Sequence, residues 1–300
     1  YARVLAMFFI VACHILQAFE SDWAFVLNVG VQMFFLISGF LYGRKDKLEV
    51  GQFFKSRLGK VYLPYVLYTA IAVATMCLVL GLSVTWKQIL CYLFNIQGFI
   101  KNPIAGLNHL WFLSVLMVGY LLTPIVRKAL NRNRFVTIAC LIVISLIEYL
   151  WLQKKYAMFT WIMLYLLGII FGSADFKYAK RIGALSIPAT TILLLLLPSV
   201  SSFTLPKYSV WLHVFLAISV LAVIYMATNL FLKYYDSEPR WIEWVDKHSY
   251  EIYLTHHLYI LGPCSLLFLS DCKILGVVLV ILCTIASSIV LKQLSKIFIK

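Results

Sequence analysis

Long apolar runs separated by short polar segments follow one another along the whole chain. A helix needs about 20 mainly apolar residues to cross the roughly 30 Å hydrocarbon core of a bilayer. Runs close to this length occur ten times, at 4–19, 24–42, 61–83, 107–126, 135–152, 156–174, 182–200, 209–232, 249–270 and 274–294. The pattern predicts an all-α fold: a polytopic integral membrane helix bundle of about ten transmembrane helices, forming a single domain over residues 1–300.

Basic residues between the runs indicate how the bundle is oriented. With the N-terminus inside, 20 of the 26 Lys and Arg residues lie in cytoplasmic segments and six lie outside. Cytoplasmic loops are enriched in Lys and Arg, and a missed span would exchange the sides of all later loops. We therefore expect the N- and C-termini to be cytoplasmic. The net charge of +14 follows from this asymmetry and does not indicate nucleic-acid binding, which needs a basic face on a soluble domain.

The composition supports a membrane protein. Hydrophobic residues make up 63% of the chain and charged residues 13%, with a mean hydropathy of +0.91. A soluble domain has about half its residues apolar and about a quarter charged. The segments 50–62 and 237–248 mix apolar and basic residues, and we expect them to lie in the headgroup layer.

The seven cysteines include no C-x-x-C pair, so neither a zinc nor a redox motif is predicted. Cys264 and Cys272 lie near one external loop, where a disulfide between them is conceivable. We predict no metal site.

Arg3 and His14 are the first ionisable residues that stand out inside an apolar run. They are 11 residues apart, about three helical turns, so they share one face of the predicted helix. Arg3 lies at the cytoplasmic boundary and His14 about 16 Å deeper, at 1.5 Å per residue. Ionisable side chains inside a span are costly and mark function by default. A boundary Arg and a His hydrogen-bonded to a neighbouring helix is the structural alternative.

A late span carries a second group of polar residues, in SYEIYLTHHLYI. Glu251 and His256 lie in its cytoplasmic half. Two adjacent residues of a helix face different directions, so we expect only one of His256 and His257 to face the site, and His257 to have a packing or interfacial role.

Three residues near the external side are candidates for contact with an acceptor substrate such as a sugar. They are His109 and Trp111 at the start of the fourth run, and Glu148 at the end of the fifth. Each also has an interfacial interpretation, because Trp and Tyr anchor helices at the membrane surface. Ser38 lies on the second run, beside Gly39. Its alternatives are close helix packing and a nucleophile, which would need a base beside it.

Five sequence motifs, in order, resemble the membrane acyltransferase family 3, whose members O-acetylate cell-surface glycans in bacteria. They are RVLAMFFIVACH, with an Arg, ten residues and a His; FFLISGFL; FFKSRLGKVYLP; HLWFLSVLMVGYLLTP; and SYEIYLTHHL. The similarity runs from residue 3 to about 260. Many relatives that acetylate peptidoglycan have acidic residues where this chain has Leu116 and Met117, which favours exopolysaccharide, capsule or lipid-linked sugars as acceptors.

The resemblance implies a membrane O-acyltransferase of the bacterial cytoplasmic membrane. It would move an acyl group, expected to be acetyl, from cytoplasmic acetyl-CoA to a glycan hydroxyl. His14, with Arg3, His256 and Glu251, would form the catalytic group. His14 would act as general base or as an acyl-carrying nucleophile. The cofactor-side residues would be Arg3, Arg57, Lys60 and Ser38, with guanidinium groups binding the CoA phosphates.

A transporter of a glycan or small metabolite is the alternative from another functional class. Buried His and Glu residues also occur in proton-coupled transporters. Transport predicts flux without acyl-CoA consumption, whereas acyl transfer predicts release of free CoA.

Overall fold

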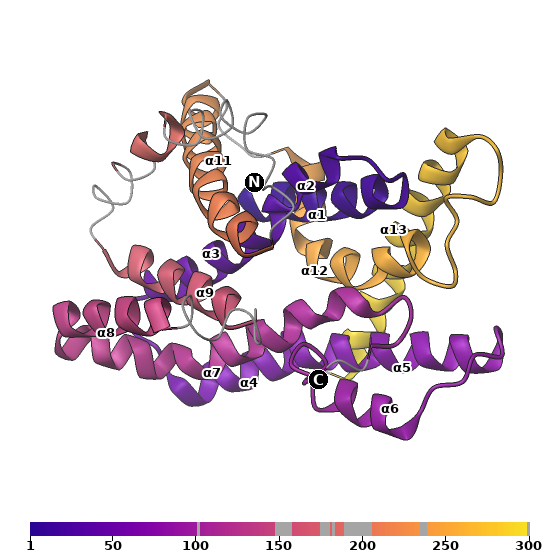
Figure 1. Cartoon of the computed structure of the whole chain (residues 1–300), viewed down its shortest axis with the longest axis horizontal. Coiled ribbons are helices and arrows are strands. Elements are labelled where there is room, and N and C mark those ends of the chain that lie inside the picture. Colours follow the sequence, from indigo (N-terminus) through magenta and orange to yellow (C-terminus); the bar gives the residue numbers. More distant parts are fainter. Residues whose placement is uncertain are drawn as a thin grey trace. The chain divides into compact units, whose positions relative to one another are not determined.

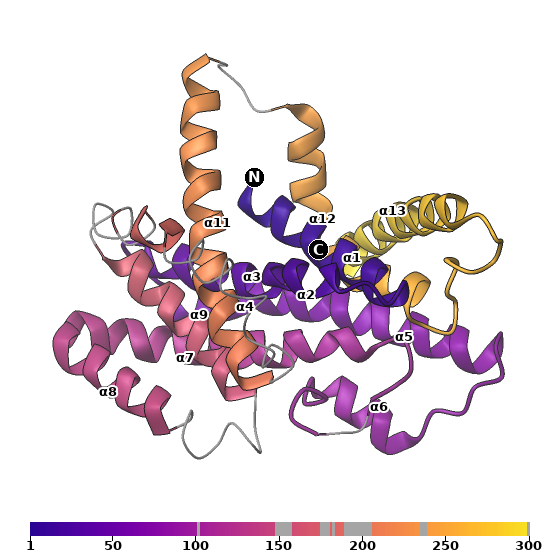
Figure 2. The same ribbon diagram turned by 45° about the horizontal axis from the view of Figure 1, so that its top comes forward.

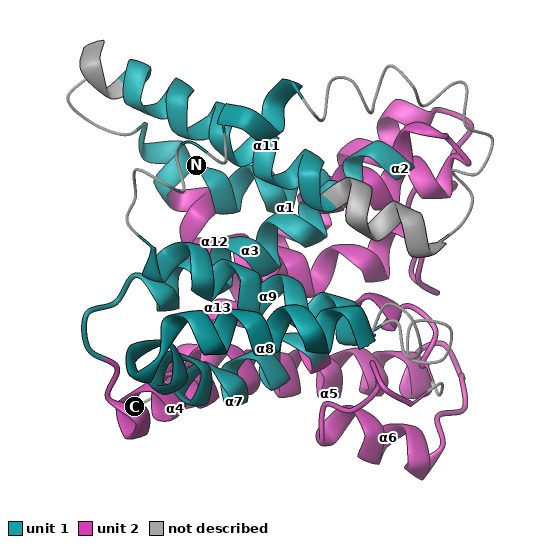
Figure 3. Ribbon diagram, turned by 60° about the vertical axis from the view of Figure 1, so that its left-hand side comes forward, with its two compact units in different colours: residues 1–9, 25–47, 115–243 teal, residues 10–24, 48–114, 244–300 magenta. Residues whose placement is uncertain are grey.

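The computed structural model describes residues 1–100, 103–147, 158–174, 181, 184–188, 206–234 and 239–298. Within this part every regular element is a helix, which confirms the all-α prediction (Figure 1). The chain divides into two compact units (Figure 3). Unit 1 comprises residues 1–9, 25–47 and 115–243, and unit 2 comprises residues 10–24, 48–114 and 244–300. Both units combine segments that are distant in sequence, and the single domain expected over residues 1–300 stays a prediction.

Helices lie at nine of the ten predicted spans, and the remaining one, 182–200, falls largely outside the described residues. The helices are α1 (Ala2–Ala18), α2 (Trp23–Leu27), α3 (Val29–Gly43), α4 (Val50–Arg57), α5 (Leu63–Leu78), α6 (Trp86–Leu93), α7 (Trp111–Arg132), α8 (Arg134–Ile147), α9 (Met158–Ser173), α11 (Pro206–Tyr234), α12 (Arg240–Ile260) and α13 (Lys273–Phe298). A π-helical turn, Leu58–Tyr62, joins α4 to α5, and a 3-10 turn, Asn108–Leu110, precedes α7.

Five helical stretches among the described residues are long and apolar enough to cross a membrane: Trp23–Gly43, Val50–Leu78, Asn108–Arg132, Val214–Phe231 and Lys273–Phe298. Helices α1, α8 and α9 are apolar but shorter. These helices support a multi-pass membrane protein. The count of ten spans and the cytoplasmic location of both termini stay predictions.

Two helix boundaries differ from the predicted ones. Residues 50–62 are continuous with α5 in one helix, Val50–Leu78. Helix α12 begins at Arg240 and ends at Ile260, so it includes most of the segment 237–248 and stops well before residue 270. The physical reason for the early end is Pro263, which cannot continue a helix and disfavours helical backbone at Gly262.

Unit 1 is built on close contact between α3 and α9 (Figures 1 and 2). A Cβ atom added at Gly39 would lie 2.0 Å from the Tyr165 carbonyl oxygen. One added at Gly172 would lie 2.2 Å from the Phe40 carbonyl oxygen. Each helix contributes two glycines four residues apart, the spacing that lets backbones approach closely in membranes; they are Gly39, Gly43, Gly168 and Gly172. Gly39, the neighbour of Ser38, therefore serves the close packing of α3 against α9.

Side-chain hydrogen bonds join the helices of unit 2. The Tyr250 hydroxyl donates to the Val61 carbonyl over 2.7 Å, which joins α12 to the π-helical turn. The Tyr259 hydroxyl lies 2.6 Å from Ser287 Oγ of α13. An apolar cluster of Ile260, Leu267 and Val280 lies beside these contacts.

A buried polar network in unit 2 fixes the loop before α7. Asn95 Nδ2 donates to the Leu113 carbonyl over 3.1 Å, and Gln97 Nε2 donates to the Leu110 carbonyl over 2.9 Å. Ser114 Oγ donates to Asn95 Oδ1 over 3.2 Å. These bonds fasten Asn95 and Gln97 to the start of α7 and to the 3-10 turn that carries His109.

Candidate functional site: four histidines in unit 2

His14 lies on α1, partly buried, with its ring against two other imidazoles. Its Nδ1 lies 2.8 Å from Gln17 Oε1, one helical turn later. An amide oxygen only accepts hydrogen bonds, so Nδ1 carries the proton and Nε2 keeps its lone pair. His14 therefore has one nitrogen oriented by its own helix and one nitrogen that can take a proton.

His256 and His257, on α12, both contact His14. The centroids of the His14 and His256 rings lie 5.2 Å apart in a stacked arrangement. Those of His14 and His257 lie 4.9 Å apart, with the rings nearly perpendicular. The expectation that His257 faces away from the site is wrong. Side chains of adjacent helical residues diverge by only about 100°, and the His14 ring contacts both of them.

His109 completes the group from the 3-10 turn before α7. Its ring stacks on His257 with centroids 4.6 Å apart and meets His256 at 5.2 Å. The side chain is only 4% exposed. His109 was predicted to lie on the external, acceptor side, apart from His14. In the structure it belongs to the same cluster as His256 and His257.

The four imidazoles form a closed ring of contacts, which we call the histidine ring. Going round it, His14 contacts His257, His257 contacts His109, His109 contacts His256, and His256 contacts His14. All four residues belong to unit 2. The ring joins three segments that are far apart in sequence.

Three hydrogen bonds fasten the turn containing His109 to α12. His109 Nε2 donates to the Leu254 carbonyl over 3.0 Å, and the Tyr253 hydroxyl donates to the His109 carbonyl over 2.6 Å. His257 Nδ1 donates to the Gly106 carbonyl over 2.9 Å. Backbone carbonyls of α12 and of the turn thus fix the positions of the His109 and His257 side chains.

Each imidazole has one nitrogen committed to an oxygen acceptor. For His256 this is Nδ1, which lies 2.7 Å from the Tyr253 carbonyl. The committed nitrogens of His14, His109 and His257 are Nδ1, Nε2 and Nδ1. Since each neutral imidazole carries one proton, the other nitrogen of every ring is an acceptor. When all four imidazoles are neutral, the histidine ring therefore offers hydrogen-bond acceptors and no free donor.

Residues 1–293 match the family model of the acyltransferase domain of acyltransferase family 3. The chain belongs to acyltransferase family 3. No curated protein and no solved structure matches it significantly. Membership of this family supports a membrane acyltransferase, with almost the whole chain forming the family domain.

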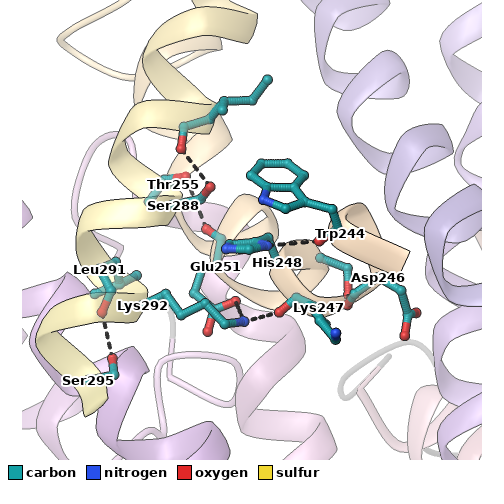
Figure 4. A network of polar contacts seen from close by, with 12 residues as sticks. Trp244, Asp246, Lys247, His248, Glu251, Thr255, Ser288, Leu291, Lys292 and Ser295 are labelled. Atoms are coloured by element: carbon teal, nitrogen blue, oxygen red, sulfur yellow. Dashed lines mark hydrogen bonds and ion pairs between the residues drawn. The ribbon is translucent and has the colours of Figure 1, made fainter. Parts of the chain in front are cut away.

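In this acyltransferase, Glu251 forms an ion pair with a residue outside the histidine ring. Its Oε2 is 3.3 Å from Lys292 Nζ on α13, and Lys292 also contacts the Lys247 carbonyl (Figure 4). Glu251 and His256 are five residues apart, which separates them by about 140° around a helix. The structure therefore brings His14 and His256 together but leaves Glu251 in an ion pair.

The histidine ring contains none of the other site residues predicted within unit 2. In unit 2, Arg57 is partly buried and donates to Ser56 Oγ over 3.0 Å, Lys60 is exposed on the π-helical turn, and Trp111 is partly buried. Arg3 is on α1 and Ser38 on α3, in residues assigned to unit 1.

Two further expectations concern residues outside the ring. Glu148 lies outside the described residues. The seven cysteines are free, so Cys264 and Cys272 do not form the disulfide considered above. Within the described part of the chain, no group of three or more His, Cys, Asp or Glu side chains could hold a metal ion.

Sequence reasoning missed the roles of Gln17 and Gly106. Gln17 follows His14 by three residues, and this spacing alone predicts a contact on one helix face. Gly106 has a φ of +78°, and an added Cβ would lie 2.7 Å from Pro263 Cδ. A left-handed position in such a tight contact favours glycine, and the carbonyl of this residue accepts the hydrogen bond from His257.

Proposed function

We propose that this protein is an O-acyltransferase of the bacterial cytoplasmic membrane, which transfers an acetyl group from cytoplasmic acetyl-CoA to a hydroxyl of a cell-surface polysaccharide or lipid-linked sugar. The observation that carries the proposal is His14 in the histidine ring: its Nδ1 is oriented by Gln17, and its Nε2 keeps a lone pair. Family membership supports acyl transfer.

His14 Nε2 takes the proton of the acceptor hydroxyl as the hydroxyl oxygen attacks the carbonyl carbon of the thioester. The C–O bond forms, the C–S bond breaks, and the proton passes to the departing sulfur, giving an ester and free CoA. Positioned general bases of this kind contribute about 10²–10⁴-fold to the rate. The neutral imidazole of His14 can accept this proton because its Nε2 carries a lone pair.

Binding of the CoA phosphates falls to cytoplasmic basic residues. Arg57 and Lys60 lie on one continuous helix of unit 2 and are the candidates there. Arg3 and Ser38, in unit 1, are further candidates. One guanidinium group can donate two parallel hydrogen bonds to a phosphate. We therefore expect Arg57 and Arg3 to bind phosphate more strongly than Lys60 and Ser38 do.

The test is acetyl-CoA turnover by the purified protein in liposomes, with wild type beside His14→Ala. We use n-octyl β-D-glucoside as the acceptor, because it places a glucose headgroup at the membrane surface. We expect CoA release and acetylated glucoside from the wild type, and a loss of at least about 100-fold in the variant. Retained thermal stability of the variant shows that folding is intact. Activity equal to wild type would remove His14 from the mechanism.

The His14→Ala comparison also addresses direct transfer. A stable acetylated protein formed from acetyl-CoA alone would indicate an acyl-histidine intermediate in place of direct attack. Absence of any acetyl-CoA binding by folded wild-type protein would overturn the proposal and favour transport.

A further inference from the structure

Two of the four imidazoles in the histidine ring each have one buried nitrogen without a hydrogen-bond partner in the part of the chain that the structure describes. These nitrogens are His109 Nδ1 and His256 Nε2. Their side chains are 4% and 0% exposed. The two rings contact each other with centroids 5.2 Å apart. Burying an unpaired acceptor costs free energy, so an orphaned pair in one place needs an explanation.

The chemistry of a binding partner follows from the protonation of the two rings. His109 donates a hydrogen bond from Nε2 to the Leu254 carbonyl, and His256 donates one from Nδ1 to the Tyr253 carbonyl. The free nitrogens are therefore acceptors and can bind only a group that donates O–H or N–H. A thioester carbonyl oxygen or an oxyanion has no proton to donate, so neither fits here while the rings are neutral.

We propose that His109 Nδ1 and His256 Nε2 form a subsite that accepts hydrogen bonds from an O–H or N–H group of a substrate and holds that group beside His14. The inference rests on the proposed function and deepens it. In that reaction two sources supply such a group: the hydroxyls of the sugar acceptor and the amides of the pantetheine arm of acetyl-CoA. His14 stacks on His256, so a group bound by His256 lies next to the proposed base.

The two nitrogens of each imidazole can be tested separately, because Asn and Gln replace different ones. An Asn amide reaches the position of Nδ1, and a Gln amide reaches that of Nε2. His109→Gln keeps a donor for the Leu254 carbonyl and loses the Nδ1 acceptor. His109→Asn does the opposite. For His256, His256→Asn keeps a donor at Nδ1 and loses the Nε2 acceptor, whereas His256→Gln retains an acceptor oxygen at Nε2.

The subsite predicts a specific order among these variants. His109→Gln and His256→Asn should weaken substrate binding about tenfold, the factor equivalent to about 1.4 kcal/mol. His109→Asn and His256→Gln keep the acceptor and should weaken substrate binding less than His109→Gln and His256→Asn do. A purely structural role for His109 predicts the reverse order for its two variants, because only His109→Asn loses the hydrogen bond to Leu254.

The experiment measures the Kd for acetyl-CoA without acceptor and the KM for n-octyl β-D-glucoside at saturating acetyl-CoA. A raised KM with unchanged Kd assigns the subsite to the acceptor hydroxyl. A raised Kd assigns it to the pantetheine amides. Unchanged values in both His109→Gln and His256→Asn would overturn the subsite while leaving the proposed function intact. Wild-type protein that binds neither probe would overturn the proposed function itself, and the subsite with it.

Discussion

The two units of this acyltransferase are stabilised in different ways. In unit 1, α3 and α9 touch through glycines, and the contact is made by backbone against backbone. In unit 2, α12 is fastened to the turn at residues 104–110 by imidazole and phenol groups that donate to carbonyls. Close packing in lipid depends on the absence of side chains, whereas a site depends on their presence and orientation. Unit 1 should therefore be sensitive to added volume and unit 2 to lost donors.

Replacing Gly39 by Val should abolish the packing of unit 1. The new Cβ would lie 2.0 Å from the Tyr165 carbonyl oxygen, and backbone atoms cannot move aside as a flexible side chain can. We expect destabilisation above about 4 kcal/mol, seen as loss of folded protein in size-exclusion chromatography. Gly51→Val is the control, because a Cβ at Gly51 meets no atom within 4 Å. Normal yield of Gly39→Val would mean that the helices are not in contact at this point.

Replacing Gly106 by Ala should damage the histidine ring while leaving unit 1 unaffected. Position 106 has a φ of +78°, and the added Cβ would lie 2.7 Å from Pro263 Cδ. We expect the left-handed backbone to cost about 1–2 kcal/mol and the displaced carbonyl to release His257. The measurement is acetyl transfer, which should fall about tenfold or more.

Gly81→Ala is the matched control for this variant. Gly81 has a φ of +64°, and a Cβ there meets no atom within 4 Å. It shares the backbone cost but not the contact with the site. Equal activity losses in the two variants would show that strain alone, and not the ring, is responsible.

Replacing Glu251 by Gln should have little effect on catalysis. The carboxylate pairs with Lys292 and not with an imidazole. Glu251 is buried and Lys292 is only partly exposed, so removing the carboxylate leaves the Lys292 charge without its partner and the thermal midpoint should fall. Acetyl transfer should remain within about threefold of wild type. A collapse of activity would show that Glu251 contacts the reacting groups after all.

Labelling of two cysteines should test the orientation of unit 2 with no expected effect on activity. Cys272 is exposed in the segment before α13, whereas burial raises the pKa of the Cys264 thiol. Since the thiolate is the reactive form, Cys264 should react more slowly at neutral pH.

In single-cysteine variants, a membrane-impermeant maleimide should label Cys272 from outside intact spheroplasts. Labelling only in inverted vesicles would reverse the predicted topology.

The hydrophobic pattern predicted the helices well because a bilayer demands long apolar runs. It predicted the start of α12 at residue 249, whereas the helix begins at Arg240, because the polar residues from Arg240 to Glu251 interrupt the apolar pattern. His14 and His256 were identified as ionisable residues inside apolar runs. Helical spacing could not link His109 to Leu254, because 145 residues separate them. Spacing relates residues on one helix, and contacts between helices follow only from the fold.

The π-helical turn Leu58–Tyr62 carries one more residue than a regular turn would need. Removing the extra residue would restore an ordinary turn and leave the following helix near its present orientation, because the wide turn is what accommodates that residue. Deleting a residue from the regular helix after it, such as Leu63, would instead rotate everything that follows by about 100° relative to α4. Tyr65, which donates to the Tyr92 carbonyl, and Tyr68, whose ring lies beside His109, would then turn away from their partners. The gene should therefore tolerate the in-frame loss of one codon between 58 and 62 better than the loss of codon 63.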